Sequence, residues 1–196
     1  MSYLDRIRAA RHDYLERLQA EYTAAKARYP RHALECLFEL PDPEDYASAY
    51  YTVDIGVLRD DAERELIEIN SEEIDLEGEF QRPGGQQLRF KGFAWSSLDL
   101  RPLDGPAEAP QAALRPWFDK WIGDGGPEGG LEDDSANDHD FAGVIHNLGF
   151  HDDHICVDLG SAPVEALEEL LDALADAGVK TIEIAPAFEA EPDAAA

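Results

Sequence analysis

Residues 143–184 read GVIHNLGFHDDHICVDLGSAPVEALEELLDALADAGVKTIEI, and they carry the clearest pattern of secondary structure in the chain. Two apolar runs, 143–148 and 154–159, flank a short segment of Gly, His and Asp, a pattern that is typical of a β-hairpin. A leucine stripe of helical spacing follows, Ser161 is expected to cap that helix, and residues 179–184 are expected to form a strand. Because a strand–helix–strand unit has a right-handed crossover and parallel strands, the stretch predicts a C-terminal ββαβ unit.

The N-terminal part of the chain predicts one long helix and a hairpin. Apolar side chains recur at three- and four-residue spacing over residues 4–29, and Pro30 ends the pattern. Residues 33–40 are expected to form a strand. Residues 49–57 alternate between apolar and polar side chains, as a half-buried strand does, and are expected to pair with residues 65–69.

The middle of the chain predicts a further strand and a short helix. Residues 88–100 are expected to form one long strand whose alternation is interrupted at Gly92 and at Ser96–Ser97, where bulges would fit. Residues 111–122 have an aromatic face at helical spacing, for which core packing is the simplest interpretation. Pro116 is best tolerated in a first helical turn, so this helix is expected to begin near residue 114.

These elements predict an α+β fold with three helices and a mixed, mainly antiparallel sheet of about six to seven strands. The 196 residues suffice for one core, so residues 1–185 are expected to form a single domain with helix 4–29 packed on it. Residues 186–196 are rich in Ala, Glu and Pro and are expected to be a disordered tail.

The charge of the chain is its strongest compositional signal. There are 43 acidic and 16 Lys or Arg residues, which give a formal net charge of −27. Such a field repels nucleic acid and anionic membrane and attracts a basic protein partner. A role in solubility alone is the competing interpretation. No run of 18 apolar residues occurs and the N-terminus does not resemble a secretory signal, so a cytoplasmic protein, monomeric or a small homo-oligomer, is expected.

Two acidic segments, 60–79 and 123–140, are candidate contact surfaces for a basic partner. The second contains five glycines, seven acids and no base, and at 18 residues it is long for a loop in a compact domain. It lacks the ligand spacing of an EF-hand calcium loop. By contrast, residues 1–32 carry net positive charge and are expected to lie against the acidic body. The predicted partner-binding residues are Glu72, Glu73, Asp75, Glu128, Glu132, Asp133, Asp134, Asp138 and Asp140.

The C-terminal hairpin also suggests a metal site as an alternative. If its turn were centred on His151, then His146, His154, Cys156 and Asp158 would share one face. Imidazole, thiolate and carboxylate are all zinc ligands. There is no HExxH and no pair of CxxC motifs, however, so ordinary polar residues on a partly wet face are the competing interpretation. The other cysteine, Cys36, is far away in sequence, which favours two reduced thiols.

No catalytic motif or cofactor is indicated. Ser161 follows a glycine but lacks the G-x-S-x-G context, and the glycines near residue 125 lack the lysine of a phosphate-binding loop. Acid pairs are so frequent in this chain that they carry no information about glycosidase chemistry. A binding protein is therefore favoured over an enzyme.

Residues Trp117–Trp121, Gly143–His146 and Val157–Leu167 (VDLGSAPVEAL) resemble the C-terminal part of a group of small, acidic, uncharacterised bacterial proteins. In size and charge, the whole chain more loosely resembles the immunity proteins of bacterial polymorphic toxins. That resemblance implies a protein that neutralises a basic toxin, such as a nuclease or a nucleotide-modifying enzyme, but it transfers no site residue. An accessory domain whose charge serves only solubility is the remaining alternative.

Overall fold

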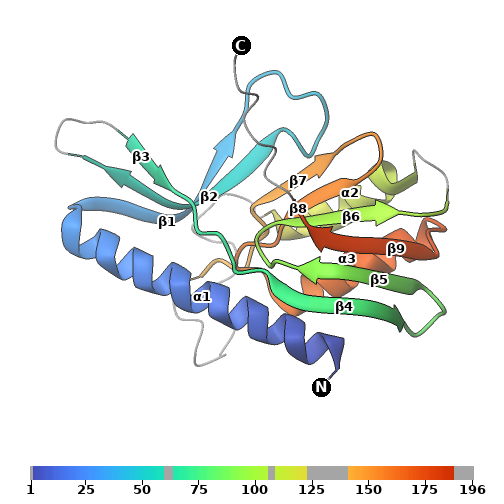
Figure 1. Cartoon of the computed structure of the whole chain (residues 1–196). Helices are drawn as coiled ribbons and strands as arrows, with labels where there is room; N and C mark the ends of the chain where they lie inside the picture. Colours follow the sequence, from blue (N-terminus) through green and yellow to red (C-terminus); the bar gives the residue numbers. More distant parts are fainter. Residues whose placement is uncertain (1, 60–63, 106–108, 123–140, 188–196) are drawn as a thin grey trace, which may run out of the picture.

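The computed structural model describes residues 2–59, 64–105, 109–122 and 141–187, which form three helices and nine strands (Figure 1). The helices are α1 (Tyr3–Arg28), α2 (Ala109–Trp121) and α3 (Val164–Asp176). The strands are β1 (Arg31–Glu39), β2 (Tyr50–Leu58), β3 (Arg64–Ile67), β4 (Ile74–Gln81), β5 (Gln87–Phe93), β6 (Leu98–Pro102), β7 (Asn147–Phe150), β8 (Ile155–Asp158) and β9 (Thr181–Pro186). Within these residues, no helix is both long enough and apolar enough to cross a membrane.

The strands form two sheets. One is the antiparallel sheet β1-β2-β3, and the other has the order β4-β5-β9-β6-β8-β7, in which only the β5–β9 pair is parallel. The predicted α+β fold with three helices is confirmed. The described strands are more numerous than the expected six to seven and are divided between two sheets. Strand β9 runs parallel to β8, as the ββαβ prediction requires, but β6 lies between them.

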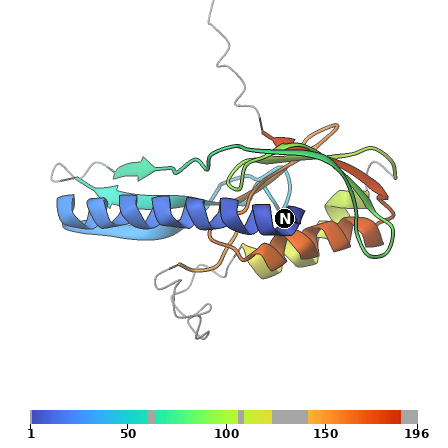
Figure 2. The ribbon, with the colours of Figure 1, turned by 60° about the horizontal axis from the view of Figure 1, so that its bottom comes forward.

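Helix α1 joins the two sheets. Its 26 residues span about 39 Å, and it crosses beneath both sheets on the face that α2 and α3 also cover (Figures 1 and 2). Ser2 and Asp5 cap its first turn reciprocally, which satisfies backbone donors that would otherwise lack partners. Of the apolar stripe predicted for this helix, Leu4 and Tyr22 are partly buried. The fully buried residues of the helix are Ile7, Tyr14, Leu18 and Ala25 of that stripe, together with Ala10 and Leu15.

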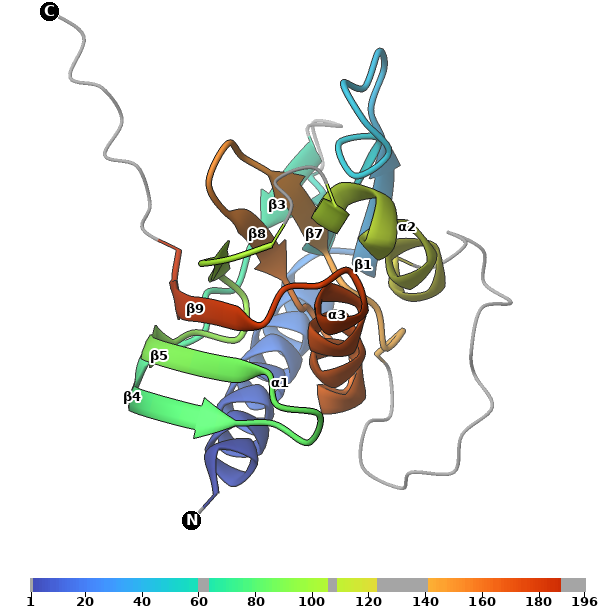
Figure 3. The same cartoon turned by 90° about the vertical axis from the view of Figure 1, so that its right-hand side faces the viewer.

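Helices α2 and α3 lie side by side on one face of the six-stranded sheet (Figure 3). The aromatic face of α2 is core packing, as predicted, and Trp117 donates a hydrogen bond from Nε1 to the carbonyl of Ala166 at 2.8 Å. The helix begins at Ala109, earlier than predicted, with Pro116 inside it. In α3, Ser161 is not the cap. The cap position is Pro163, and Ser161 Oγ instead accepts hydrogen bonds from the amides of residues 143 and 144.

The single strand predicted over residues 88–100 is two strands, β5 and β6, which lie on opposite sides of β9. Gly92, the last but one residue of β5, has a φ of +121° that suits only glycine, and after Phe93 the chain turns through Trp95 before β6 begins. A side chain at position 92 would also meet the Glu73 carboxylate at 2.7 Å and the Pro186 ring at 3.1 Å. The β4–β5 register does shift opposite Gly92, between Ile74 and Glu77, so the irregularity expected there is present. The interruption at Ser96–Ser97 marks the passage from β5 to β6 and not a bulge.

The basic N-terminal helix does contact the acidic middle of the chain. Arg17 forms an ion pair with Glu72, and Arg6 donates a hydrogen bond to the carbonyl of Asp75. The predicted partner-binding residues 72, 73 and 75 therefore lie at or next to α1, where at least one carboxylate already has a cationic neighbour within the chain. The other six predicted residues, and the tail from residue 188, lie outside the described residues.

Candidate functional site

The β7–β8 hairpin has a different register from the one that the metal prediction assumed. That prediction placed Leu148 opposite His154, whereas Leu148 lies opposite Val157. The amide of His151 donates to the carbonyl of His154 at 2.9 Å, so Asp152–Asp153 forms the tip of a tight turn that was predicted to be centred on His151.

The register of the hairpin thus differs by three residues from the predicted one, and this changes which side chains share a face with His154 and Cys156. An odd register shift moves one strand's side chains to the opposite face of the sheet. His146 therefore does not join His154 and Cys156, and its ring lies near Asp158 instead, so the prediction of one cluster of these four residues is wrong. His151 takes its place, because it lies across the hairpin from His154.

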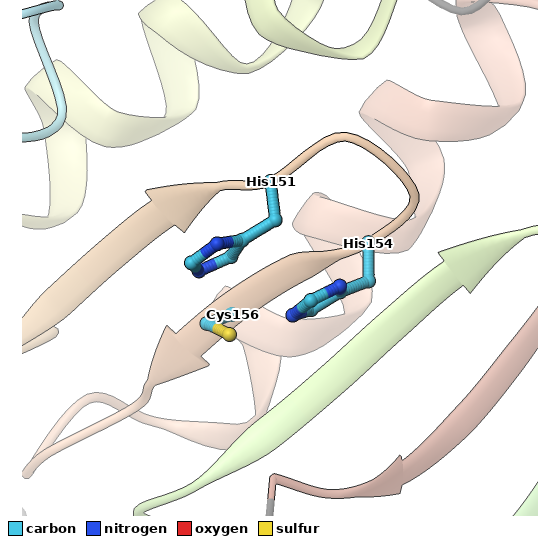
Figure 4. A group of neighbouring side chains, drawn as sticks. All are labelled: His151, His154 and Cys156. Carbon is cyan, nitrogen blue, oxygen red and sulfur yellow. The ribbon is translucent and has the colours of Figure 1, made fainter. Parts of the chain in front are cut away.

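His151, His154 and Cys156 form a compact cluster on this face (Figure 4). One nitrogen of each ring and the sulfur all lie within 4.8 Å of one another. The two imidazole rings are stacked, with centroids 4.4 Å apart and planes 10° apart. A glycine, Gly149, faces Cys156 across the hairpin, and a Cβ there would lie 3.5 Å from His151 Nε2. The ring of His151 thus reaches over Gly149, toward the strand that carries Cys156.

Two carboxylates border this cluster. The thiol of Cys156 donates a hydrogen bond to Asp99 Oδ1 at 3.0 Å, and His154 Nε2 lies 3.8 Å from the same oxygen. His154 Nδ1 lies 2.7 Å from Asp153 Oδ1, and Arg101 forms an ion pair with that carboxylate at 3.2 Å. Burial, with the Asp99 hydrogen bond and charge, raises the pKa of the Cys156 thiol to about 12, so the thiol is protonated at neutral pH.

A second cluster surrounds His146, at the junction of the two sheets. The His146 side chain is 1% exposed, and its carbonyl accepts a hydrogen bond from the amide of Thr52 on β2 at 2.8 Å. Its Nε2 lies 3.1 Å from Glu35 Oε1 on β1. Its Nδ1 lies 3.5 Å from Asp54 Oδ1 and 4.0 Å from Asp158 Oδ2. Three carboxylates therefore share one buried imidazole.

The carboxylates of this cluster are held in place by other donors. Asp54 accepts hydrogen bonds from the hydroxyl of Tyr14 on α1 and from the amide of Ile69, the latter at 2.7 Å. The amide of Ala142 donates to Glu35 Oε2. Glu35 has a φ of +48°, and Asp42 is the only other described residue besides glycine with a positive φ, so the backbone is strained at this carboxylate.

The protonation of this cluster follows from burial and charge. Burial disfavours an imidazolium, but the hydrogen bond to Glu35 and the nearby carboxylates outweigh it and raise the pKa of His146 to about 9. Burial raises the pKa of Asp158, which the charge of His146 opposes. Burial and the neighbouring carboxylates also raise the pKa of Tyr14, so its hydroxyl stays protonated and can donate to Asp54. At neutral pH the cluster thus has one cation among several acidic groups.

A cavity of about 230 Å³ adjoins this cluster and separates β2 from β6 and β8. Its walls include the carboxylates of Asp54, Glu68 and Asp158, and no Lys or Arg is among its described lining residues. The lining residues are Tyr51, Thr52, Asp54, Glu68, Ile69, Asn70, Ser96, Ser97, Leu98, Asn147, Cys156, Val157, Asp158 and Ala187.

Two buried polar atoms at this cavity lack a hydrogen-bond partner within the described part of the chain. One is Oγ1 of Thr52, a wall residue that is 6% exposed, and the other is Nδ1 of His146, which faces the wall residues Asp54 and Asp158. Buried polar atoms normally have partners, so an unpaired hydroxyl in a cavity wall is a position at which a bound polar group would be stabilised.

Sequence reasoning identified the hairpin histidines and Cys156 but missed Glu35, Asp54 and Tyr14. Asp54 had a usable signal, because it stands on a strand whose neighbours Val53 and Ile55 are buried and apolar. Glu35 and Tyr14 had none, since both fit ordinary strand and helix patterns.

Comparison with protein-family models, with curated proteins and with solved structures gave no match. The function must therefore be argued from the chemistry of these two sites.

Proposed function

We propose that this chain is an acidic protein-binding module whose partner is a basic protein, in the manner of an immunity protein or antitoxin. A nuclease or a nucleotide-modifying toxin would have the required cationic surface. The observation that supports this proposal is the cavity between β2 and β8, whose walls present three carboxylates and, among the described residues, no Lys or Arg.

The cavity suits the head group of a basic side chain. At about 230 Å³ it is smaller than the ~300–1,000 Å³ of typical drug-sized pockets, which favours a side chain over a larger ligand. A guanidinium group has five donors in a planar fork and pairs well with carboxylates. Glu68 and Asp158 would accept from it, the buried carboxylate of Asp54 would add negative charge, and the free Oγ1 of Thr52 would gain a donor.

The remaining charge would act mainly on the rate of association. Carboxylates on an exposed surface contribute little to binding energy, but they attract an oppositely charged partner over a distance comparable to the Debye length. Glu72, Glu73 and Asp75 on the described surface, and the acidic residues of segment 123–140, have this role in the proposal. Partner binding should therefore weaken as ionic strength rises.

Glu68→Gln is expected to weaken the binding of an acetylated, amidated hexa-arginine peptide by about tenfold, equivalent to about 1.4 kcal/mol. The reason is that Glu68 lies in the cavity wall, so the substitution removes a direct acceptor for a guanidinium group. Calorimetric titrations of the full chain at a series of salt concentrations measure the effect.

The matched control is Glu77→Gln, which removes the same charge from an exposed position on β4 outside the cavity wall. It is expected to weaken peptide binding less than twofold. Equal losses in both variants, or an affinity that stays flat from low to high salt, would contradict the proposal and leave solubility as the role of the charge.

A further inference from the structure

The sheet topology brings side chains from two neighbouring strands to one point beside the β7–β8 turn. His151 and His154 lie opposite each other across the turn, and Cys156 follows His154 at the two-residue spacing that keeps both on one face. Asp99 comes from β6, where it is the register partner of Cys156. Three potential ligands thus meet beside the turn, and Asp99, which is more than 50 residues from them in sequence, adjoins two of them, Cys156 and His154.

The donor set selects a class of metal. Two imidazoles and a thiol are the ligands of zinc and of other transition metals, whereas calcium and magnesium prefer sites made of oxygen ligands. Zinc with nitrogen and sulfur ligands is usually four-coordinate and tetrahedral. The three ligands of the hairpin leave one coordination position of the metal open. The Asp99 carboxylate borders two of these ligands, at 3.0 Å from the sulfur and 3.8 Å from His154 Nε2.

We propose that His151, His154, Cys156 and Asp99 bind one divalent transition-metal ion, for which zinc is the best-suited candidate. This site does not depend on the proposed binding of a basic partner. It also differs from the site expected from the sequence, because His151 replaces His146 and Asp99 replaces Asp158.

A carboxylate already orients one of the ligands. Asp153 Oδ1 lies 2.7 Å from Nδ1 of His154, and Arg101 holds that carboxylate from the other side. A carboxylate that accepts a hydrogen bond from one ring nitrogen leaves the other ring nitrogen free to coordinate a metal, and it makes that nitrogen a more basic ligand. The remaining nitrogen, Nε2, is the one that lies near Asp99.

Binding requires two local changes. The two rings are within 10° of parallel, and because the lone pair of each nitrogen lies in its ring plane, the rings must tilt out of the stack for both to reach one ion. The thiol of Cys156 must also lose its proton, so the S–H bond is replaced by a sulfur–metal bond and one proton passes to the solvent. Metal affinity is therefore expected to increase with pH.

Cobalt(II) provides a direct probe, because its tetrahedral complexes absorb in the visible and a bound thiolate adds a charge-transfer band in the near ultraviolet. We expect the tag-free full chain to bind one equivalent of Co²⁺ with both features, and Zn²⁺ to displace it. Cys156→Ser should abolish the charge-transfer band, and His154→Ala or Asp99→Asn should weaken Co²⁺ binding by about 10- to 100-fold.

The second cysteine supplies the matched control. Cys36 lies on β1 with a free thiol that is likewise half-buried, so Cys36→Ser should leave both the charge-transfer band and the affinity unchanged. Three results would overturn the proposal: Co²⁺ binding without a thiolate band, a band that survives Cys156→Ser, or substoichiometric binding. Circular dichroism of each variant without metal separates loss of a ligand from loss of the fold.

Discussion

Replacement of Gly160 by alanine is expected to destabilise the protein by about 3–5 kcal/mol, which is the range of severe single substitutions. Gly160 has a φ of +48°, which disfavours any residue with a Cβ. The added Cβ would also lie 2.2 Å from Cδ2 of His146, a ring that Glu35 holds in a buried site. The ring can move away only by breaking its contact with Glu35, and the Gly160 backbone is itself fixed by a 2.7 Å hydrogen bond from Trp95 Nε1 to its carbonyl.

Gly143→Ala separates the two causes of this effect. Gly143 also has a positive φ, +72°, but an added Cβ there meets nothing within 4 Å. Its substitution should cost only the conformational penalty, about 1 kcal/mol. Urea unfolding of both variants measures the difference. If Gly160→Ala is no more harmful than Gly143→Ala, then the close packing of Gly160 on His146 is not a feature of the folded protein.

His146→Gln is expected to destabilise the protein by about 3–5 kcal/mol near pH 6, because removing one partner of a buried ion pair leaves the other charges uncompensated. Glu35, Asp54 and Asp158 would then lose the cation that they share. His12→Gln is the control. His12 lies 3.4 Å from Glu16 on the exposed face of α1, and pairs of that kind contribute about 0–1 kcal/mol.

The cost of His146→Gln should depend on pH. The pKa of His146 is raised from 6.5 to about 9 in the folded protein, so the folded state binds more protons than the unfolded state between these values. The stabilisation is therefore complete below pH 6.5 and is lost as the pH rises through 9. Unfolding free energies measured from pH 6 to 10 should fall more steeply for the wild type than for the variant. A gap that widens with pH would contradict the assignment of His146 as a buried cation.

Local pattern and composition were sufficient to predict the helices and the fold class. Helix α1 has a repeating apolar stripe, and the α3 region has leucines at helical spacing followed by Gly178 at φ +93°, so neighbouring residues alone specify both. The exchange of strands between Phe93 and Leu98 was not predictable, because which strand pairs with β9 depends on packing between distant segments. Strand β4 was missed although Ile74, Leu76 and Phe80 alternate with polar residues, because Gly78 interrupts the apolar face and the acidic residues were interpreted as a contact surface.

The sites were harder to predict, because register and long-range contacts decide them. Cys156 and His154 were correctly predicted to be neighbours. The tip of the turn, however, lies at Asp152–Asp153 and not at His151, so His151 lies beside them and His146 does not. The contact between His146 and Glu35 joins residues 111 positions apart across two sheets, and no local pattern encodes it.

The central claim is that the cavity between β2 and β8 accepts a cationic side chain. A titration of isotope-labelled full chain with N-acetyl-arginine amide, followed by amide chemical shifts, tests it most directly. We expect saturable shifts at Thr52, Asn70 and Asn147 in the cavity wall, which Glu68→Gln weakens and Glu77→Gln does not. Small shifts spread over the acidic surface, with none that saturate at the cavity, would contradict it.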